Sequence, residues 1–180
     1  MSNINLKLYS IIVLFCITPF TSYAETSPKP VNIVEVQNLL REGQVAAEKR
    51  LPILIMFSMD QCPYCELIRE DFLKPMIRSG DYTDKVIIRE VHSDSYATLL
   101  DFDGAKISSD ELASRYGASL SPTVVFLDHK GQQLNKKMIG ITTVHYYGGY
   151  LDEAIDASYK RMQNNFRQAS NMQAYANISN

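Results

Sequence analysis

Two cysteines, Cys62 and Cys65, stand two residues apart at the point where the sequence changes from one pattern to another. Before them, residues 52–57 form a continuous apolar run without alternation, which is typical of a strand buried on both faces. After them, apolar residues recur at helical spacing through residues 66–79. The chain therefore places a close-spaced thiol pair between a central strand and a helix, and this junction constrains the fold more than any other feature.

The rest of the chain repeats this change of pattern. Apolar spacing predicts helices over residues 33–50, although Gly43 weakens the first, and over residues 110–116 and 147–166, with Ser109 as a cap of the second. Strands are predicted at residues 85–92, 123–127 and 133–139, and a turn at 128–131 makes the last two a hairpin. The polar residues 93–108 are predicted as a loop with a turn at Asp103-Gly104. Pro75 should bend the helix at 66–79, which Gly80 ends. Helices alternating with strands imply an α/β layer architecture.

The first 24 residues have the pattern of a secretory signal peptide. Lys7 precedes the apolar run 11–20, and the small residues Ser22 and Ala24 fit cleavage after Ala24. We expect a linker at 25–32, a folded domain at 33–168 and a polar, flexible tail at 169–180. The exported protein is then periplasmic or secreted and is not embedded in a membrane. Of the three cysteines, it retains Cys62 and Cys65.

Composition excludes several classes of protein. The chain has 180 residues, of which 46% are hydrophobic, and this is an ordinary globular mixture. The formal net charge of -2 gives no basic excess, so no nucleic-acid partner is expected. Three cysteines are too few for a disulfide scaffold.

A cysteine pair at this spacing has four interpretations: a haem attachment site, half of a zinc site, a redox dithiol or two inert thiols. Haem attachment needs a histidine directly after the second cysteine, and Glu66 stands there. Zinc needs two further ligands, but the chain has no second close pair, and His92, His129 and His145 are isolated in sequence. Inert thiols fit an oxidising compartment poorly. A redox dithiol is therefore the leading interpretation, and metal binding by both cysteines is the alternative.

The predicted position supports redox chemistry. Cys62 falls at a helix N-terminus, where unpaired N–H groups favour a thiolate. Pro63 suits the first helical position, and Cys65, one turn later, is better shielded and placed to resolve a mixed disulfide. Asp60 and Glu66 oppose thiolate formation through charge repulsion.

Five stretches together resemble the thioredoxin-fold superfamily, and within it the exported bacterial thioredoxin-related proteins of the SoxW type. They are residues 55–58, 62–65, 101–104, 111–117, and 121–128 with Gly131. The resemblance implies a thioredoxin fold, with a central mixed sheet flanked by helices, and thiol–disulfide oxidoreductase activity.

The resemblance also implies roles for individual residues. Cys62 would be the attacking thiol and Cys65 the resolving one. Pro122 would be a cis-proline facing the cysteines, and Ser121 beside it would pair with an extended client peptide. Pro63 and Tyr64 would belong to the same substrate-binding surface. Neither a bound cofactor nor a metal is expected.

The chain departs from its relatives in ways that bear on its activity. Met56 stands where thioredoxins carry a buried aspartate, so the usual proton acceptor for the resolving thiol is missing, and Gln61 replaces the tryptophan before the first cysteine. The chain has no room for the helical insertion of DsbA-type oxidases and no N-terminal dimerisation domain of the DsbC type. Because the resembled family is thioredoxin-like and no DsbA-type insertion is present, we expect a reductant or isomerase of client proteins, with a DsbA-like oxidant as the alternative. For a reductant, the resemblance implies electrons from a DsbD-like membrane donor.

Overall fold

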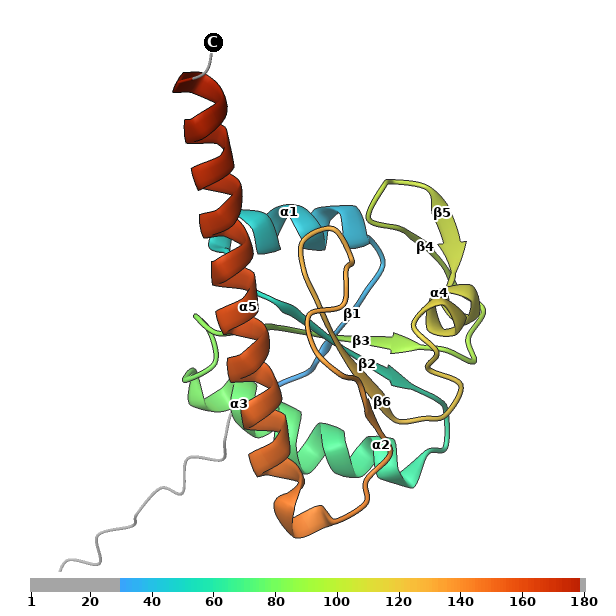
Figure 1. Ribbon diagram of the computed structural model, residues 1–180. Helices are drawn as coiled ribbons and strands as arrows, with labels where there is room; N and C mark the ends of the chain where they lie inside the picture. The colour runs from blue at the N-terminus through green and yellow to red at the C-terminus, as the bar shows by residue number, and fades with distance from the viewer. Residues whose placement is uncertain (1–29, 179–180) are drawn as a thin grey trace, which may run out of the picture.

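The computed structural model describes residues 30–178, so the predicted signal peptide and its cleavage site lie outside the described residues. A five-stranded sheet with the strand order β1–β3–β2–β6–β7 forms the centre of the domain (Figure 1). The strands are β1 (Val34–Glu35), β2 (Ile53–Ser58), β3 (Ile87–His92), β6 (Thr123–Leu127) and β7 (Met138–Ile139).

The strand directions make the sheet mixed. β1, β3 and β2 run parallel to one another, whereas β6 is antiparallel to β2 and to β7. Every residue of β2 and of β6 is buried, which confirms the central strand predicted from its unbroken apolar run. The pairing of Phe57 with Thr123 brings the end of β2 beside the start of β6.

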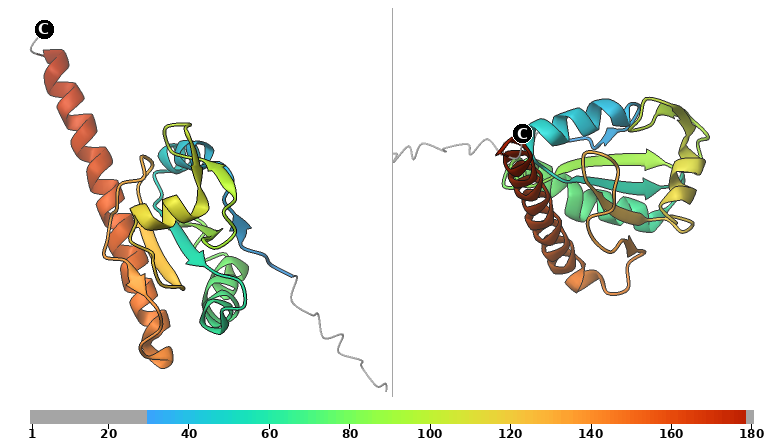
Figure 2. Two further views of the ribbon diagram at one scale, coloured as in Figure 1. Left: turned by 90° about the vertical axis from the view of Figure 1, so that its right-hand side faces the viewer. Right: turned by 45° about the horizontal axis from the view of Figure 1, so that its top comes forward.

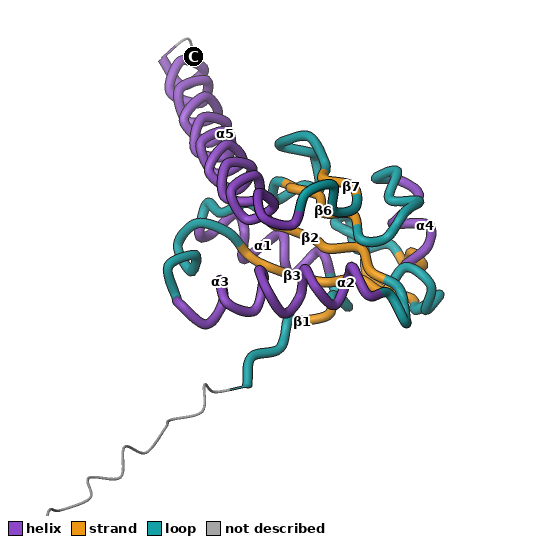
Figure 3. Tube along the Cα trace, turned by 90° about the horizontal axis from the view of Figure 1, so that it is seen from below, coloured by secondary structure: helices purple, strands orange, loops and turns teal. Residues whose placement is uncertain are grey.

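Helices cover both faces of the sheet, as Figures 2 and 3 show from two sides. Alternate residues of β2 point to opposite faces. Ile53, Ile55 and Phe57 pack in one core cluster with α1 (Leu39–Lys49) and α4 (Ser109–Arg115). Leu54 and Met56 pack in a second cluster with the helices α2 (Pro63–Ile68) and α3 (Lys74–Ser79) and with the first turns of α5 (Val144–Ile178). The α/β layer architecture is thereby confirmed.

The first helix begins later than predicted. Residues 34–35 pair with β3 as strand β1, and the Val36 N–H donates to the Glu90 carbonyl at 2.9 Å. The helix starts only after Asn38, whose side chain accepts a hydrogen bond from the Arg41 N–H at 2.9 Å. Helical spacing before this cap was misleading, because pairing with a distant strand determines the backbone there.

The segment 93–108 is not the plain loop that its polarity predicts. It contains β4 (Thr98–Leu100) and β5 (Lys106–Ser108), which form an antiparallel pair around the predicted turn at Gly104. The buried residues Leu99 and Ile107 lie opposite each other, and a single buried apolar residue in each strand is too weak a pattern to predict a strand. The cap of α4 is Ser108 rather than Ser109, and its N–H donates to the Glu111 side chain.

The helix predicted at 66–79 starts three residues earlier, at Pro63, and has three parts. A π-helical turn, η1 (Arg69–Leu73), separates α2 from α3, and the Lys74 N–H donates to the Arg69 carbonyl five residues back. Pro75 follows this wide turn, which leaves space for a ring that an ordinary helical turn would exclude. The end of the helix at Gly80, which has a φ of 80°, lies where predicted.

Near the C-terminus, one element is shorter and one is longer than predicted. The hairpin partner of β6 is reduced to β7 and an isolated bridge between Leu127 and Gln133. Helix α5 runs from Val144 to Ile178 and so includes residues 169–178, which were expected to be a flexible tail. The stretch after residue 149 has neither glycine nor proline to end a helix. The last turns of α5 extend beyond the rest of the domain (Figure 1). Among the described residues, no helix is both long and apolar enough to cross a membrane.

Candidate active site

Cys62 and Cys65 form a disulfide at the start of α2, with their Cα atoms 5.2 Å apart. Cys62 is the N-cap residue with extended backbone, and Pro63 follows at the first helical position, as predicted. The Cys65 N–H donates to Cys62 Sγ at 3.1 Å. A tight loop carries the chain from β2 to this cap, and within it Gln61 has a φ of 53°.

The two sulfurs differ in their access to solvent. Cys62 is half-buried, whereas Cys65 is only 1% exposed. A partner molecule can therefore reach the sulfur of Cys62 before that of Cys65. The buried Cys65 sulfur contacts Cys62 from the protein side. The N–H directed at Cys62 Sγ would also stabilise a thiolate at that atom.

The other predicted site residues lie at the same end of the sheet. Tyr64 is 60% exposed on the first turn of α2. The Ser121–Pro122 peptide bond is cis, and these residues immediately precede β6, which begins beside the end of β2. Pro122 is buried, and its carbonyl accepts a hydrogen bond from the Gly140 N–H at 2.8 Å. Tertiary structure thus brings the cysteine pair and the Ser121-Pro122 motif, which are far apart in the sequence, to the same end of the sheet.

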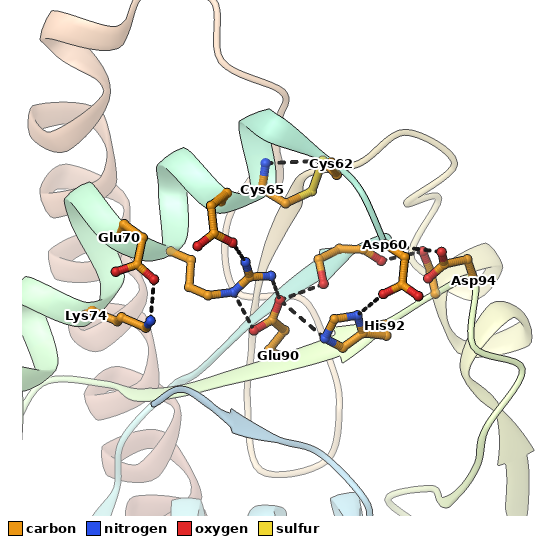
Figure 4. A network of polar contacts seen from close by, with 12 residues as sticks. Asp60, Cys62, Cys65, Glu70, Lys74, Glu90, His92 and Asp94 are labelled. Carbon is orange, nitrogen blue, oxygen red and sulfur yellow. Dashed lines mark hydrogen bonds and ion pairs between the residues drawn. A yellow bond between two sulfur atoms is a disulfide. The ribbon is translucent and has the colours of Figure 1, made fainter. Parts of the chain in front are cut away.

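A buried carboxylate, Glu90, lies between β3 and the helix that carries the cysteines (Figure 4). Arg69 donates two hydrogen bonds to this carboxylate, from Nη2 at 2.6 Å and from Nε at 3.2 Å. Ser58 Oγ, at the end of β2, donates to the same carboxylate at 2.6 Å. The network therefore connects the strand before the cysteines, the helix after them and the neighbouring strand β3.

The network determines the charge state of its members. Burial raises the pKa of Glu90, but hydrogen bonds from Arg69 and Ser58 and the guanidinium charge outweigh burial, so the net pKa is lowered. The hydrogen bond to Glu90 in turn raises the pKa of Arg69. The pair is thus an ion pair at neutral pH. Removing one partner of a buried ion pair costs about 3–5 kcal/mol, because the other charge is left uncompensated.

Further charged groups surround this pair. Arg69 also forms an ion pair with Glu66, and His92 lies 3.8 Å from Glu90 and 3.7 Å from Asp60 through its two ring nitrogens. An open hollow beside the disulfide is lined by Met59, Asp60, Gln61, Cys62, Pro63, Glu66, Arg69 and His92. Of the three histidines treated as isolated, His92 therefore belongs to the site. His129 instead stacks on Phe166, with ring centroids 5.1 Å apart.

Sequence reasoning missed Glu90 and Arg69. Met56 stands at the position where, by the resemblance described above, thioredoxins carry a buried aspartate, and the parallel register places Glu90 directly opposite it. Both side chains therefore point to the face that α2 covers. The signal available in the sequence was the pair of charged residues Arg89-Glu90 between the apolar residues Ile88 and Val91 within a predicted strand.

One side-chain group among residues 30–178 has the composition of a metal site. Asp60, His92 and Asp94 offer ligand atoms within 4.8 Å of one another, at the rim of the hollow. Asp94 Oδ2 accepts a hydrogen bond from the Asp60 N–H at 2.9 Å. Neither cysteine belongs to this group.

The sequence profile of the thioredoxin-like domain family matches residues 41–155, which is more than half of the chain. The protein belongs to the thioredoxin-like domain family. Its mixed sheet, with the cysteine pair just before α2, is the thioredoxin fold predicted from the sequence. This fold with a disulfide-capable CxxC pair is the arrangement of a thiol–disulfide oxidoreductase.

The chain is also similar to several solved structures. The structure described as DsbH oxidoreductase is 18% identical and covers 74% of this chain and 92% of its own, with a TM-score of 0.51. Thioredoxin O2 from Arabidopsis thaliana is 18% identical, with coverages of 71% and 97% and a TM-score of 0.48. A thioredoxin from Malassezia sympodialis is 22% identical, with coverages of 73% and 99% and a TM-score of 0.46. Comparison with curated protein sequences found no significant match.

Proposed function

We propose that this protein is an exported oxidoreductase that reduces or isomerises disulfide bonds of client proteins through Cys62 and Cys65. The observation that carries the proposal is the asymmetric pair itself. A half-buried Cys62 at a helix N-terminus is bonded to a fully shielded Cys65 one turn later. Such a pair accepts one partner sulfur at a time and then closes on itself.

The reaction proceeds in two exchanges. In the reduced protein, the Cys62 thiolate attacks one sulfur of a client disulfide, forms a mixed disulfide and releases the other client sulfur as a thiolate. The Cys65 thiol then loses its proton and attacks Cys62 Sγ, which forms the Cys62–Cys65 disulfide and releases the second client thiolate. Two electrons pass to the client, whose thiolates take up two protons. An isomerase stops after the first exchange and lets a client thiolate displace Cys62.

The client would bind at the end of the sheet that lies next to the disulfide. Ser121 and Pro122 immediately precede β6, at the end of the sheet from which the Cys62 loop starts, and backbone at Ser121 would pair with an extended client segment. Tyr64, beside Pro63 at the start of α2, and Leu120, 65% exposed, add apolar surface at the same edge. An unfolded client segment with apolar side chains matches this surface.

Export and the electron source complete the proposal. The signal-peptide pattern at residues 1–24 supports a periplasmic or secreted location, where thiols are normally oxidised. A reductant there needs electrons from across the membrane, and a DsbD-like membrane protein is the proposed donor.

The decisive measurement is the reduction potential of the Cys62–Cys65 pair, by equilibration of the purified protein in glutathione buffers. We expect a value near that of thioredoxin, about −270 mV, whereas a value near that of DsbA, about −120 mV, would make the protein an oxidant. Cys65→Ser should trap mixed disulfides with clients, and Cys62→Ser, its matched control, should trap none. Absence of any exchange, together with tight 1:1 binding of zinc or copper(I) by the reduced protein, would replace the proposal with a metal-binding role.

A further inference from the structure

The Arg69–Glu90 pair lies within the helix–sheet layer that carries the reactive disulfide. The Arg69 N–H donates to the Cys65 carbonyl, so Arg69 follows Cys65 by one helical turn. Its side chain and Cys62 line the same hollow. Glu90 rises from β3 toward this helix (Figure 4) and is 4% exposed. Because Glu90 is buried and Arg69 is half-buried, bulk water screens their charges less than it screens charges on the surface.

Several carboxylates surround the positive charge of Arg69. Arg69 is the cation of the hollow, and Glu90 and Glu66 both engage it. Asp60 adds a further carboxylate on the loop before Cys62, and His92 is close to both Asp60 and Glu90. Asp94, which accepts a hydrogen bond from the Asp60 N–H, faces the same loop. A bare guanidinium would favour a thiolate, but these carboxylates offset it.

We propose that Glu90 is a positioning residue for the dithiol: it holds the Arg69 guanidinium at the hollow that Cys62 also lines and offsets its charge, so that the Cys62 thiolate is less stable than beside a free guanidinium. This inference rests on the proposed exchange reaction. A less stable thiolate makes Cys62 a poorer leaving group from its disulfide and favours the disulfide form. The arrangement therefore biases the protein toward donating electrons.

The experiment follows the Cys62 thiol in the reduced protein by the pH dependence of its alkylation with iodoacetamide, read at the Cys62 peptide by mass spectrometry. Glu90→Gln removes a negative charge and should lower the pKa of Cys62. Arg69→Met removes the positive charge and should raise it. Shifts in the pKa of Cys62 of about half a unit to one unit are expected from the loss of one such partly screened charge. The double variant should lie between the single variants, near the wild type.

A matched ion pair provides the control. Arg89, the neighbour of Glu90 on β3, pairs with Glu42 of α1 at 2.8 Å on the opposite face of the sheet. Arg89→Met and Glu42→Gln should destabilise the fold as buried-pair variants do, yet leave the pKa of Cys62 unchanged. Arg69→Lys, which keeps the charge with less disturbance, should stay close to the wild type.

The outcomes separate the two proposals. Opposite shifts for Glu90→Gln and Arg69→Met support the electrostatic role, because loss of packing alone would move both variants in the same direction. Shifts of the same sign, equal shifts from the control pair, or no shift in variants that retain native circular dichroism would overturn it. If Arg69→Met does not fold, Arg69→Lys and Glu90→Gln decide: the role is refuted unless only Glu90→Gln lowers the pKa. If the wild type shows no disulfide exchange, but the two variants still shift the pKa of Cys62 in opposite directions, the proposed function is refuted and the electrostatic role of Glu90 is not.

Discussion

Gly43, in the middle of α1, has no room for a methyl group. A Cβ built there would lie 2.5 Å from the backbone carbonyl oxygen of His129 and 3.2 Å from Phe102 Cδ1. Gly43→Ala should therefore destabilise the protein, although alanine is the better helix former. The turn 128–131 that supplies the His129 carbonyl is itself fixed by the Asp128 side chain, which accepts hydrogen bonds from Lys130 and Gln132.

Two opposing effects determine the magnitude. Replacing glycine by alanine within a helix stabilises it by about 1 kcal/mol. Overpacking against a neighbour costs about 1–3 kcal/mol, and a backbone carbonyl that must move by most of an ångström belongs at the upper end of that range. The net loss is about 2 kcal/mol, which lowers the melting temperature by about 4–8 °C for a chain of this size.

The assay is urea unfolding followed by far-UV circular dichroism, with Gly149→Ala as the matched control. Gly149 also lies within a helix, α5, but a Cβ there meets nothing within 4 Å. Gly149→Ala should therefore stabilise the protein by about 0.5–1 kcal/mol. The reasoning is refuted if Gly43→Ala is as stable as the wild type, or if both substitutions change stability in the same direction.

Three further predictions concern stability. The lowered pKa of Glu90 contributes stability that is complete above the unfolded-state pKa, about 4.3, and is lost as the pH falls through the folded-state pKa. Glu90→Gln leaves the Arg69 charge uncompensated and should therefore be less stable at neutral pH by about 3–5 kcal/mol. Acid titration of the unfolding free energy should show that this loss of stability becomes smaller below about pH 4, and a loss that stays constant would contradict the reasoning. Tyr116 donates its hydroxyl to the Gly131 carbonyl at 2.9 Å, and its pKa is raised to about 12 mainly by burial. Tyr116→Phe should cost about 1 kcal/mol in urea unfolding and remove a phenol that ionises near pH 12 in ultraviolet titration, and an unchanged titration would count against the assignment. Asn38→Ala should cost about 1 kcal/mol in thermal unfolding, because it leaves the Arg41 N–H without its cap, whereas Asn38→Asp should retain most of the stability.

The sequence was sufficient for features that depend on neighbouring residues. The apolar run of β2, the cysteine pair at the start of α2 and the stop at Gly80 are local patterns, and each lies where predicted. Helix and strand periodicity need only a few consecutive residues. Together with the motif at Ser121-Pro122, these local patterns carry the resemblance from which the thioredoxin fold and its cysteine pair were predicted.

Tertiary structure alone decided the features that join distant residues. Glu90 meets Arg69 across 21 residues and Ser58 across 32, and only the parallel pairing of β2 with β3 brings them together. Gly43 weakened a helix prediction, yet its absent side chain is what lets α1 approach the His129 carbonyl. Periodicity reports which face of an element is apolar, but not which buried polar groups will meet there. That depends on strand order and register, which are fixed by contacts between distant segments.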